Sequence, residues 1–312
     1  MLAARVKGTE KMVTIRVPAT SANLGPGFDV VGMALNIYNT VEMAPEPSGA
    51  TVVDVTGEGA SLLCKSGSKL LVEAARKVFA AAGAGQPGLL IRQHNRIPLF
   101  RGMGSSAAAI AGGMAAANAL LPEPLAAKKI LQLATEMEGH PDNVAPALFG
   151  GFVASCAVNG DIHYACIESP AALKLAVAVP AFTLPTKKSR QALPQMVPMA
   201  DAVFNIGQVA LLVAALCRGD LAALSHAMND RLHQQYRSAL IPGLDNVFSA
   251  AQSAGALATV LSGAGPAVIS FVSGNEAIVG AAMHRAFAAC GVRCRIILTS
   301  VGKTGALNSN VS

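Results

Sequence analysis

A glycine-rich loop that runs directly into an alanine-rich segment is the strongest constraint in this sequence. The loop is Gly102-Met103-Gly104-Ser105-Ser106-Ala107, and the segment 107–121 contains no proline, which favours a helix. This junction predicts an anion cradle, because glycines let the backbone approach a phosphate and the first N–H groups of a helix lack intrahelical partners. The helix dipole adds about half a positive charge at the same end. The loop alone also fits a tight turn followed by a serine N-cap.

A second polar segment, PATSANLGPGFD at 18–29, follows a predicted strand over 13–17. Its prolines and glycines make a stiff connector that presents Asn23 and Asp29 to a ligand. An aspartate beside a small polar ligand suits an ammonium group. An irregular turn capped by asparagine and aspartate is the alternative.

Two more segments carry groups suited to a nucleotide site. Glu136-Met137-Glu138-Gly139-His140-Pro141-Asp142-Asn143 closes a predicted helix over 124–138 and offers a carboxylate for the Mg²⁺ of bound ATP. The alternative is a loop of solvated charges at the end of a helix. Leu261-Ser262-Gly263-Ala264-Gly265-Pro266-Ala267 follows a strand and is small enough to pack against another glycine loop or a phosphate. A plain β-turn is the alternative there.

Length and composition limit the class of protein. With 312 residues, 52% of them hydrophobic and 13% charged, the chain predicts two packed domains and excludes disorder. The net charge of +6 suits anionic small ligands. Aromatic residues make up only 4% and tryptophan is absent, so stacking platforms for RNA or single-stranded DNA are scarce and we expect no nucleic-acid partner.

The sequence also predicts a protein of the cytoplasm with no membrane contact. The two most apolar stretches, 107–121 and 202–217, are rich in alanine and glycine or interrupted by Asn118, Asn205 and Gln208. The N-terminus lacks the apolar core of a signal peptide, and residues 1–11 form a polar, aperiodic fringe. The six scattered cysteines, at 64, 156, 166, 217, 290 and 294, are expected to be reduced thiols in the core.

The order of predicted elements favours an α+β fold with a boundary near residue 168. Strands in the first half are expected at 13–17, 39–43, 50–55, 88–95, 150–158 and 161–167, with helices at 68–82, 107–121 and 124–138. The second half predicts strands at 173–180, 259–265, 267–273 and 293–301, and helices at 201–217, 219–229 and 275–290. That order resembles a β-α-β-β-α-β unit.

Several familiar motifs are excluded. Gly302-Lys303-Thr304 looks like the end of a P-loop, but Ile297 stands where that motif needs its first glycine. Gly83, Gly85 and Gly88 match a dinucleotide fingerprint in spacing only, because they follow a helix and precede a strand. Zinc-protease, esterase and protein-kinase motifs are absent from the sequence.

The four segments, in this order and spacing, resemble the GHMP family of small-molecule kinases. The matching blocks are PATSANLGPGFD, RGMGSSAAA, EGHPDNVAPALFGG and LSGAGPAV, and the resemblance covers the chain from Met12 onward. It implies a two-domain GHMP kinase architecture: a ribosomal protein S5 domain 2-like N-terminal domain over 12–167 that binds ATP, and a ferredoxin-like C-terminal domain over 168–312. It also implies a left-handed β-α-β crossover in the first domain, a site between the domains and a homodimer.

The resemblance further implies a set of site residues. Those expected at the nucleotide are Pro98, Leu99, Arg101, Gly102, Met103, Gly104, Ser105, Ser106 and Ala107. Ser106 and Glu136 are the expected Mg²⁺ ligands, with Glu138 as the rival of Glu136. Those expected at the acceptor are Asn23, Asp29, His140, Asp142, Asn143, Thr186, Arg190, Arg237 and Gly263. Lys69 departs from the asparagine of many members, which puts the adenine contacts in doubt.

The implied reaction is transfer of the γ-phosphate of ATP to an alcohol. Asp29 would face an α-ammonium group, and Arg190 and Arg237 would hold an α-carboxylate, since a guanidinium matches a carboxylate in geometry. These groups favour a zwitterion, and the resemblance implies L-homoserine as the acceptor, on a route to threonine. Asn143 stands where some relatives carry an aspartate and would orient the hydroxyl, so the expected catalytic residues are Asn143, Ser106 and Glu136 with no general base. The alternatives are another alcohol such as mevalonate, and a catalytically silent RNA-binding protein.

Overall fold

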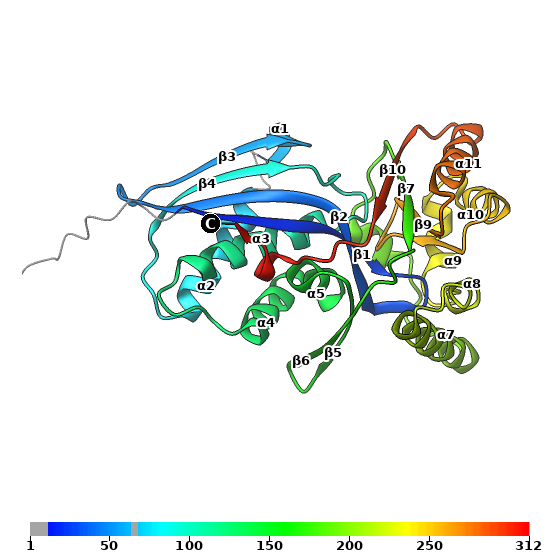
Figure 1. Ribbon diagram of the computed structural model, residues 1–312, viewed down its shortest axis with the longest axis horizontal. Coiled ribbons are helices and arrows are strands. Elements are labelled where there is room, and N and C mark those ends of the chain that lie inside the picture. The colour runs from blue at the N-terminus through cyan, green and yellow to red at the C-terminus, as the bar shows by residue number, and fades with distance from the viewer. Residues whose placement is uncertain (1–11, 64–67, 312) are drawn as a thin grey trace, which may run out of the picture.

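The computed structural model describes residues 12–63 and 68–311 and arranges them around two sheets (Figure 1). The first sheet contains β1 (Val13–Asn23), β2 (Gly27–Glu46), β3 (Thr51–Gly57), β4 (Gly88–Asn95), β5 (Phe152–Val158), β6 (Asp161–Ile167) and β11 (Asn310–Val311). Its main order is β11-β1-β2-β4-β3, and β5 pairs with β2 and β6. Only β3 and β4 pair in parallel, and the chain between them contains helix α2.

Alternation of apolar and polar residues decides which face of this sheet is buried. In β1, Val13, Ile15 and Val17 are buried, whereas Arg16 is exposed, as a half-buried strand requires. The sheet's helices are α1 (Ala60–Leu62), α2 (Ser68–Ala81), α3 (Ser105–Leu120), α4 (Ala127–Glu138) and α5 (Pro141–Phe149). Figure 1 shows α2 to α5 gathered on one face of the sheet.

Helix α3 is the centre of the N-terminal half because its side chains are small. It contacts β1, β2, α2, α4 and α5, and every residue from Ala107 to Asn118 is buried. A side chain at Gly113 would place its Cβ 2.5 Å from the Leu71 carbonyl oxygen, so only glycine allows α2 to lie this close. Alanine and glycine thus let α3 pass between the sheet and its neighbouring helices.

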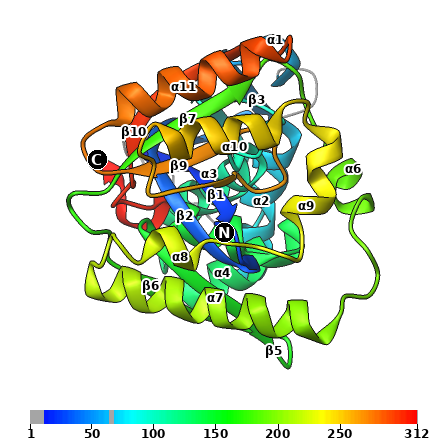
Figure 2. The ribbon, with the colours of Figure 1, turned by 90° about the vertical axis from the view of Figure 1, so that its right-hand side faces the viewer.

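The second sheet is antiparallel, in the order β10-β7-β9-β8. Its strands are β7 (Lys174–Pro180), β8 (Ala258–Leu261), β9 (Val268–Val272) and β10 (Cys294–Ser300). The helices of this half are α6 (Thr186–Gln191), α7 (Met199–Arg218), α8 (Leu224–Ala227), α9 (Gln234–Arg237), α10 (Leu244–Ser253) and α11 (Glu276–Ala289), with short 3₁₀ turns at Ser238–Leu240 and Ala306–Asn308. Helices α10 and α11 lie side by side on one face of this sheet (Figure 2). The strands and α11 follow the predicted β-α-β-β-α-β order, but the first helix packed on the sheet is α10 and not one of those predicted at 201–217 and 219–229.

The two sheets divide the chain between Ile167 and Lys174, but the last residues cross back. After β10, Val301 bridges Leu35 of β2, and β11 pairs with β1 at the edge of the first sheet. The prediction had placed all residues to 312 in the C-terminal domain. This return path, together with a core cluster that includes residues of both sheets, ties the halves together.

Several elements differ from their predictions. Helix α5 was not predicted; its Pro141 stands at the first helical position, where its missing N–H costs nothing. Helices α9 and α10 were not predicted, and the helix expected at 219–229 is only the short α8. Strand β1 continues through Asn23, so much of the expected connector is a strand with a register shift between Pro18 and Ala19.

The prediction that the cysteines lie in the core was wrong. Cys156, Cys166 and Cys217 are free and exposed rather than in the core, and Cys290 and Cys294 are only partly buried; Cys64 and the fringe at 1–11 lie outside the described residues. Within the described part of the chain, helix α7 is long and apolar enough to cross a membrane by length and composition, although 202–217 had been discounted. Only 22% of its apolar window is buried.

Candidate active site

A cavity of about 410 Å³ opens where the two halves of the chain meet. The described residues that line it come from β1, the start of β2, the end of α1, α2, the 99–104 loop, the start of α3, the α4–α5 junction, α6, α9 and the 263–264 loop. The predicted site residues in its wall are Asn23, Asp29, Leu99, Arg101, Gly102, Met103, Gly104, Ser105, Ser106, His140, Asp142, Asn143, Thr186, Arg190, Arg237 and Gly263. Segments separated by more than 200 residues in sequence therefore share one cavity.

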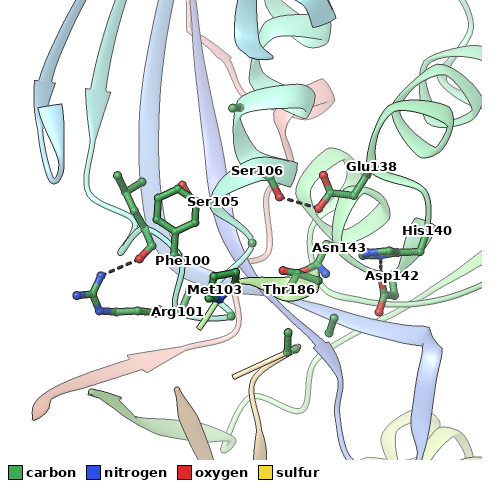
Figure 3. A pocket seen from close by; sticks show the side chains of 18 of the residues that line it. Phe100, Arg101, Met103, Ser105, Ser106, Glu138, His140, Asp142, Asn143 and Thr186 are labelled. Carbon is green, nitrogen blue, oxygen red and sulfur yellow. Dashed lines mark hydrogen bonds and ion pairs between the residues drawn. The ribbon is translucent and has the colours of Figure 1, made fainter. Parts of the chain in front are cut away.

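The glycine loop has the backbone that an anion cradle needs. Gly104 is the N-cap of α3 with φ of 65°, and Gly102 has φ of 72°, both in the left-handed region that favours glycine. At Gly104 no side-chain cap occupies the first N–H groups of α3, so these donors remain available to a ligand. Ser105 and Ser106 are the first two residues of α3 and are labelled in Figure 3.

The second glycine loop packs against the first, which is one of the alternatives that the sequence left open. A Cβ at Gly102 would lie 2.1 Å from the Ser262 carbonyl oxygen, so the backbone of the second loop lies where a side chain at Gly102 would stand. The Ser262 hydroxyl donates to the Gly102 carbonyl at 2.6 Å, and the Ala267 N–H donates to the Arg101 carbonyl at 3.2 Å. The C-terminal half thereby fixes the shape of the cradle.

Arg101 lines the cavity, but its guanidinium is fully engaged with backbone. Its Nε donates to the Pro180 carbonyl at 2.8 Å, and its two terminal nitrogens donate to the carbonyls of Leu99 and Ala181 at 2.7 Å each. This side chain joins the glycine loop to the end of β7.

Glu138, and not Glu136, lies beside the cradle. The Ser106 hydroxyl donates to Glu138 Oε1 at 2.7 Å, and the two side chains face each other in Figure 3. Glu136 is outside the cavity and pairs with Lys77 at 2.9 Å, because two residues along a helix turn the side chain by about 200°. Burial raises the pKa of Glu138 more than its bond to Ser106 lowers it. The helical spacing Ile130, Ala134, Glu138 could have identified the inward carboxylate.

Asn143, at the start of α5, is oriented toward the cradle by a neighbouring hydroxyl. Thr20 Oγ1 donates to Asn143 Oδ1 at 2.8 Å, and the Thr20 N–H donates to the Met103 carbonyl at 3.1 Å. With its oxygen engaged by Thr20, Asn143 retains its amide N–H groups as donors for a ligand. Thr20 was not among the predicted residues, although it lies inside the PATSAN segment.

His140 and Asp142 form a hydrogen-bonded pair on the floor of the cavity. His140 Nδ1 lies 2.5 Å from Asp142 Oδ1, and the Asp142 side chain is almost fully buried. Burial lowers the pKa of His140, but the hydrogen bond and charge of Asp142 and the charge of Glu138 outweigh it, so the pKa of His140 is raised. Asp29, His140 and Asp142 place potential ligand atoms within 4.8 Å of one another, although Asp29 is paired with Arg190.

Asp29 and Arg190, predicted to hold opposite ends of a zwitterion, hold each other here. Arg190 donates two hydrogen bonds to Asp29, at 3.0 and 2.7 Å, and this raises the pKa of Arg190. Asp29 has a positive φ of 56°, and its N–H donates to Asn23 Oδ1 at 3.1 Å. Asn23 in turn donates to the Gly263 carbonyl at 2.9 Å.

The far end of the cavity is apolar, and sequence reasoning missed most of it. Its residues include Leu62, Leu63, Leu70, Phe100 and Ala109. Lys69, the position linked to the adenine, does not line the cavity and lies 3.8 Å from Glu73. Pro98, Ala107 and Glu136 are also outside the wall, and the first two are buried behind it.

Comparison with known proteins places this site in a family. The family model described as "GHMP kinases N terminal domain" matches residues 69–151, and the model described as "GHMP kinases C terminal" matches residues 212–289. A homoserine kinase of Moorella thermoacetica is 48% identical over 91% of this chain and 96% of its own length. One of Carboxydothermus hydrogenoformans is 46% identical over 95% of this chain and 97% of its own length.

Solved structures agree with these relatives. A homoserine kinase from Cytophaga hutchinsonii aligns with a TM-score of 0.85 and 31% identity, covering 97% of this chain and 99% of that one. A mevalonate kinase from L. major aligns with a TM-score of 0.71 at 16% identity over 96% of this chain and 99% of that one, a likeness of fold alone. The chain belongs to the GHMP kinase family, and within that family to the homoserine kinases.

Proposed function

We propose that this chain transfers the γ-phosphate of ATP to the side-chain hydroxyl of L-homoserine, giving O-phospho-L-homoserine and ADP. The observation that carries the proposal is a single cavity lined both by the glycine loop with the N-terminus of α3, which suit a phosphate, and by a charged set that suits a zwitterion. That set is Asp29, Arg190 and Arg237, and Asn143 lines the same cavity. The hydroxyl of a bound amino acid would thereby face the terminal phosphate.

The nucleotide end is supported by backbone and apolar contacts. The free N–H groups of α3 and the glycine loop would hold the phosphates, and the leucines and Phe100 of the far end would enclose the adenine. Positioning and charge stabilisation dominate phosphoryl transfer, so such a rigid cradle supplies much of the catalysis.

Ser106 and Glu138 fit a magnesium ion, and Glu138 replaces Glu136 in this role. Hydroxyl and carboxylate oxygens are the donors that Mg²⁺ takes from proteins, and these two oxygens lie 2.7 Å apart at the cradle. Glu138 is a partly buried carboxylate whose pKa is raised by desolvation, and a bound cation would stabilise its ionised form. When bound, the ion would neutralise charge on the phosphates.

The acceptor end discriminates by charge. We infer that the α-ammonium of L-homoserine takes the place of Arg190 at Asp29, while the α-carboxylate takes the place of Asp29 at Arg190. Opposite charges then remain paired throughout binding, so neither side chain is left desolvated and alone. Mevalonate has no ammonium group to offer Asp29, which makes it the weaker candidate.

A dedicated general base is not required. Asn143 cannot accept a proton, but its amide N–H groups can orient the hydroxyl oxygen while Thr20 holds its carbonyl. His140 Nδ1 is occupied by Asp142. We propose that the hydroxyl proton passes to the transferring phosphate itself, which suits a loose transition state in which nucleophile activation contributes little.

An ADP-release assay tests the proposal. L-Homoserine, L-threonine, L-serine and mevalonate are compared at equal concentration with Mg-ATP. The proposal predicts turnover mainly with L-homoserine. Turnover only with mevalonate would discard the roles of Asp29 and the arginines, and no turnover with any alcohol would refute kinase activity on this set.

We also propose that the enzyme is a cytoplasmic homodimer. The exposed side of α7 carries large apolar side chains, including Met199, Val203, Ile206 and Leu211, with exposed fractions of 55–77%. A continuous apolar face of this length exceeds what single scattered residues produce and marks an interaction surface. A second copy could cover it with the same face about a two-fold axis.

A further inference from the structure

Arg237 is held by buried neighbours that the reaction, as proposed above, does not use. Its side chain is 2% exposed, and its NH1 group faces two acceptors: the Gly263 carbonyl oxygen at 3.0 Å and His233 Nδ1 at 3.1 Å. Its Nε is buried and has no hydrogen-bond partner among the described residues. A buried N–H donor without an acceptor is costly, so this guanidinium is built to receive one more acceptor.

The tautomer of His233 follows from its contacts. His233 is fully buried, and burial, together with the charge of Arg237, lowers its pKa to about 4, so the ring is neutral at pH 7. Its Nε2 lies 2.8 Å from the Gly25 carbonyl oxygen, which can only accept, so Nε2 carries the proton. Nδ1 therefore has a free lone pair and accepts the hydrogen bond from Arg237.

His233 thus connects two segments that contact the acceptor substrate. One is Arg237 on α9, and the other is the turn at Gly25, which lies between Asn23 and Asp29. The ring of Phe28 stacks on His233 with centroids 5.4 Å apart. The guanidinium of Arg237 lies 5.5 Å from the centre of the same Phe28 ring.

Asp230 fixes the backbone that carries His233. Its side chain is fully buried and accepts from the N–H groups of Leu232, His233 and Gln234 at 2.9, 3.0 and 2.7 Å. It also accepts from Asn205 Nδ2 of α7 at 2.9 Å. The same Asn205 Nδ2 lies 3.1 Å from the Pro26 carbonyl oxygen, which joins this turn to the substrate loop a second time.

We infer that His233 and Asp230 are positioning residues that hold Arg237 and the 23–29 loop in one rigid frame, aiming the guanidinium at the carboxylate of the acceptor. This inference rests on the proposed function, because it needs a carboxylate-bearing acceptor in the cavity. The inference predicts a selective effect. Replacing His233 or Asp230 should weaken acceptor binding and leave nucleotide binding unchanged, since neither residue lies in the glycine loop at the start of α3. A merely structural role would affect both substrates through stability.

A double-mutant cycle tests the coupling between His233 and Arg237. His233→Leu should raise the KM for L-homoserine roughly tenfold or more, the effect of losing a hydrogen bond to a charged group, with the KM for ATP within about threefold. In an Arg237→Met background, which keeps the side-chain volume, the same change should raise that KM less than about threefold. If His233→Leu raises the KM for L-homoserine by the same factor in both backgrounds, or raises the KM for ATP equally, the inference is overturned.

Two conservative variants separate the roles of the two ring nitrogens. Asparagine places an acceptor near the position of Nδ1, whereas glutamine places a donor near Nε2. His233→Asn should therefore return the KM for L-homoserine closer to wild type than His233→Gln does. Rescue by glutamine and not by asparagine would assign His233 to the Gly25 turn alone and refute its action through Arg237.

Controls distinguish this inference from folding and from the proposed function. His226→Leu changes an exposed histidine seven residues earlier and should leave both KM values unchanged. Thermal unfolding of each variant shows that the compared proteins are folded. A wild-type enzyme that does not phosphorylate L-homoserine would refute the proposed function, whereas a working wild type with additive variants would refute only this inference.

Discussion

Replacing Glu138 with glutamine separates the magnesium ligand proposed here from the ligand that the sequence favoured. The change keeps the shape of the side chain and its contact with Ser106 but removes the negative charge. A unit charge near a bound ion is worth about 4 kcal/mol at an effective dielectric of about 20 and 4 Å separation. Glu138→Gln should therefore lower kcat by roughly 10²- to 10³-fold, a size also typical of losing one group that stabilises transition-state charge.

Glu136→Gln is the matched control, because it lies on the same helix two residues earlier. Its carboxylate is 47% exposed and pairs with Lys77, a surface ion pair that contributes about 0–1 kcal/mol. This variant should keep kcat within about fivefold of wild type. The assay is ADP release over a Mg²⁺ titration at saturating L-homoserine, and Glu138→Gln should also shift the Mg²⁺ dependence to higher concentration.

Thermal stability without Mg²⁺ gives a second measurement, in which Glu138→Gln should be more stable than wild type although it is less active. Burial raises the folded-state pKa of Glu138 above its unfolded value, so its stabilising contribution is complete below the unfolded pKa and declines as pH rises through the folded pKa. At pH 8 without Mg²⁺, Glu138→Gln should unfold at a higher temperature than wild type. If Glu136→Gln loses activity while Glu138→Gln keeps it, the assignment from the structure is refuted.

Three further predictions use the same protein. Arg190→Ala should raise the KM for L-homoserine roughly tenfold or more, through lost charged hydrogen bonds, and an unchanged KM would remove its role. The pKa of His140 is raised, so the contribution of this histidine to stability declines as pH rises through its folded-state pKa. In His140→Gln, the free energy of unfolding measured with urea should therefore depend less on pH between pH 6 and 8, roughly the range where histidine titrates. Ile206→Asp should convert a dimer to a monomer in light scattering, whereas Ile278→Asp, 64% exposed on α11, should not; two dimeric variants would remove α7 as the interface.

The local features of this fold were predictable because their causes are local. Alternating apolar residues predicted β1 and β4, helical spacing predicted α2, and the glycine loop before a run of alanines predicted the start of α3. Each signal depends on neighbours within a few residues, where propensity, periodicity and capping act. The order of the four polar segments then indicated the family.

Other features were missed because local signals pointed the other way. Two prolines argued against α5, yet one stands at the first turn, where a proline is tolerated. Scattered cysteines suggested a core, but packing leaves at least three of them exposed. Helix α7 has an exposed face of apolar side chains, and a short stretch of sequence cannot distinguish such a face from one that packs in the core.

By itself the sequence determined which chemical groups were present: a glycine-rich loop before a helix, an acidic cluster and a pair of arginines. Only the tertiary structure decided which side chains act together. It turned Glu138 inward and Glu136 outward, paired Asp29 with Arg190, and placed His233 between Arg237 and Gly25. These contacts join residues up to 208 positions apart, and they depend on how sheets and helices pack, which no short window of sequence contains.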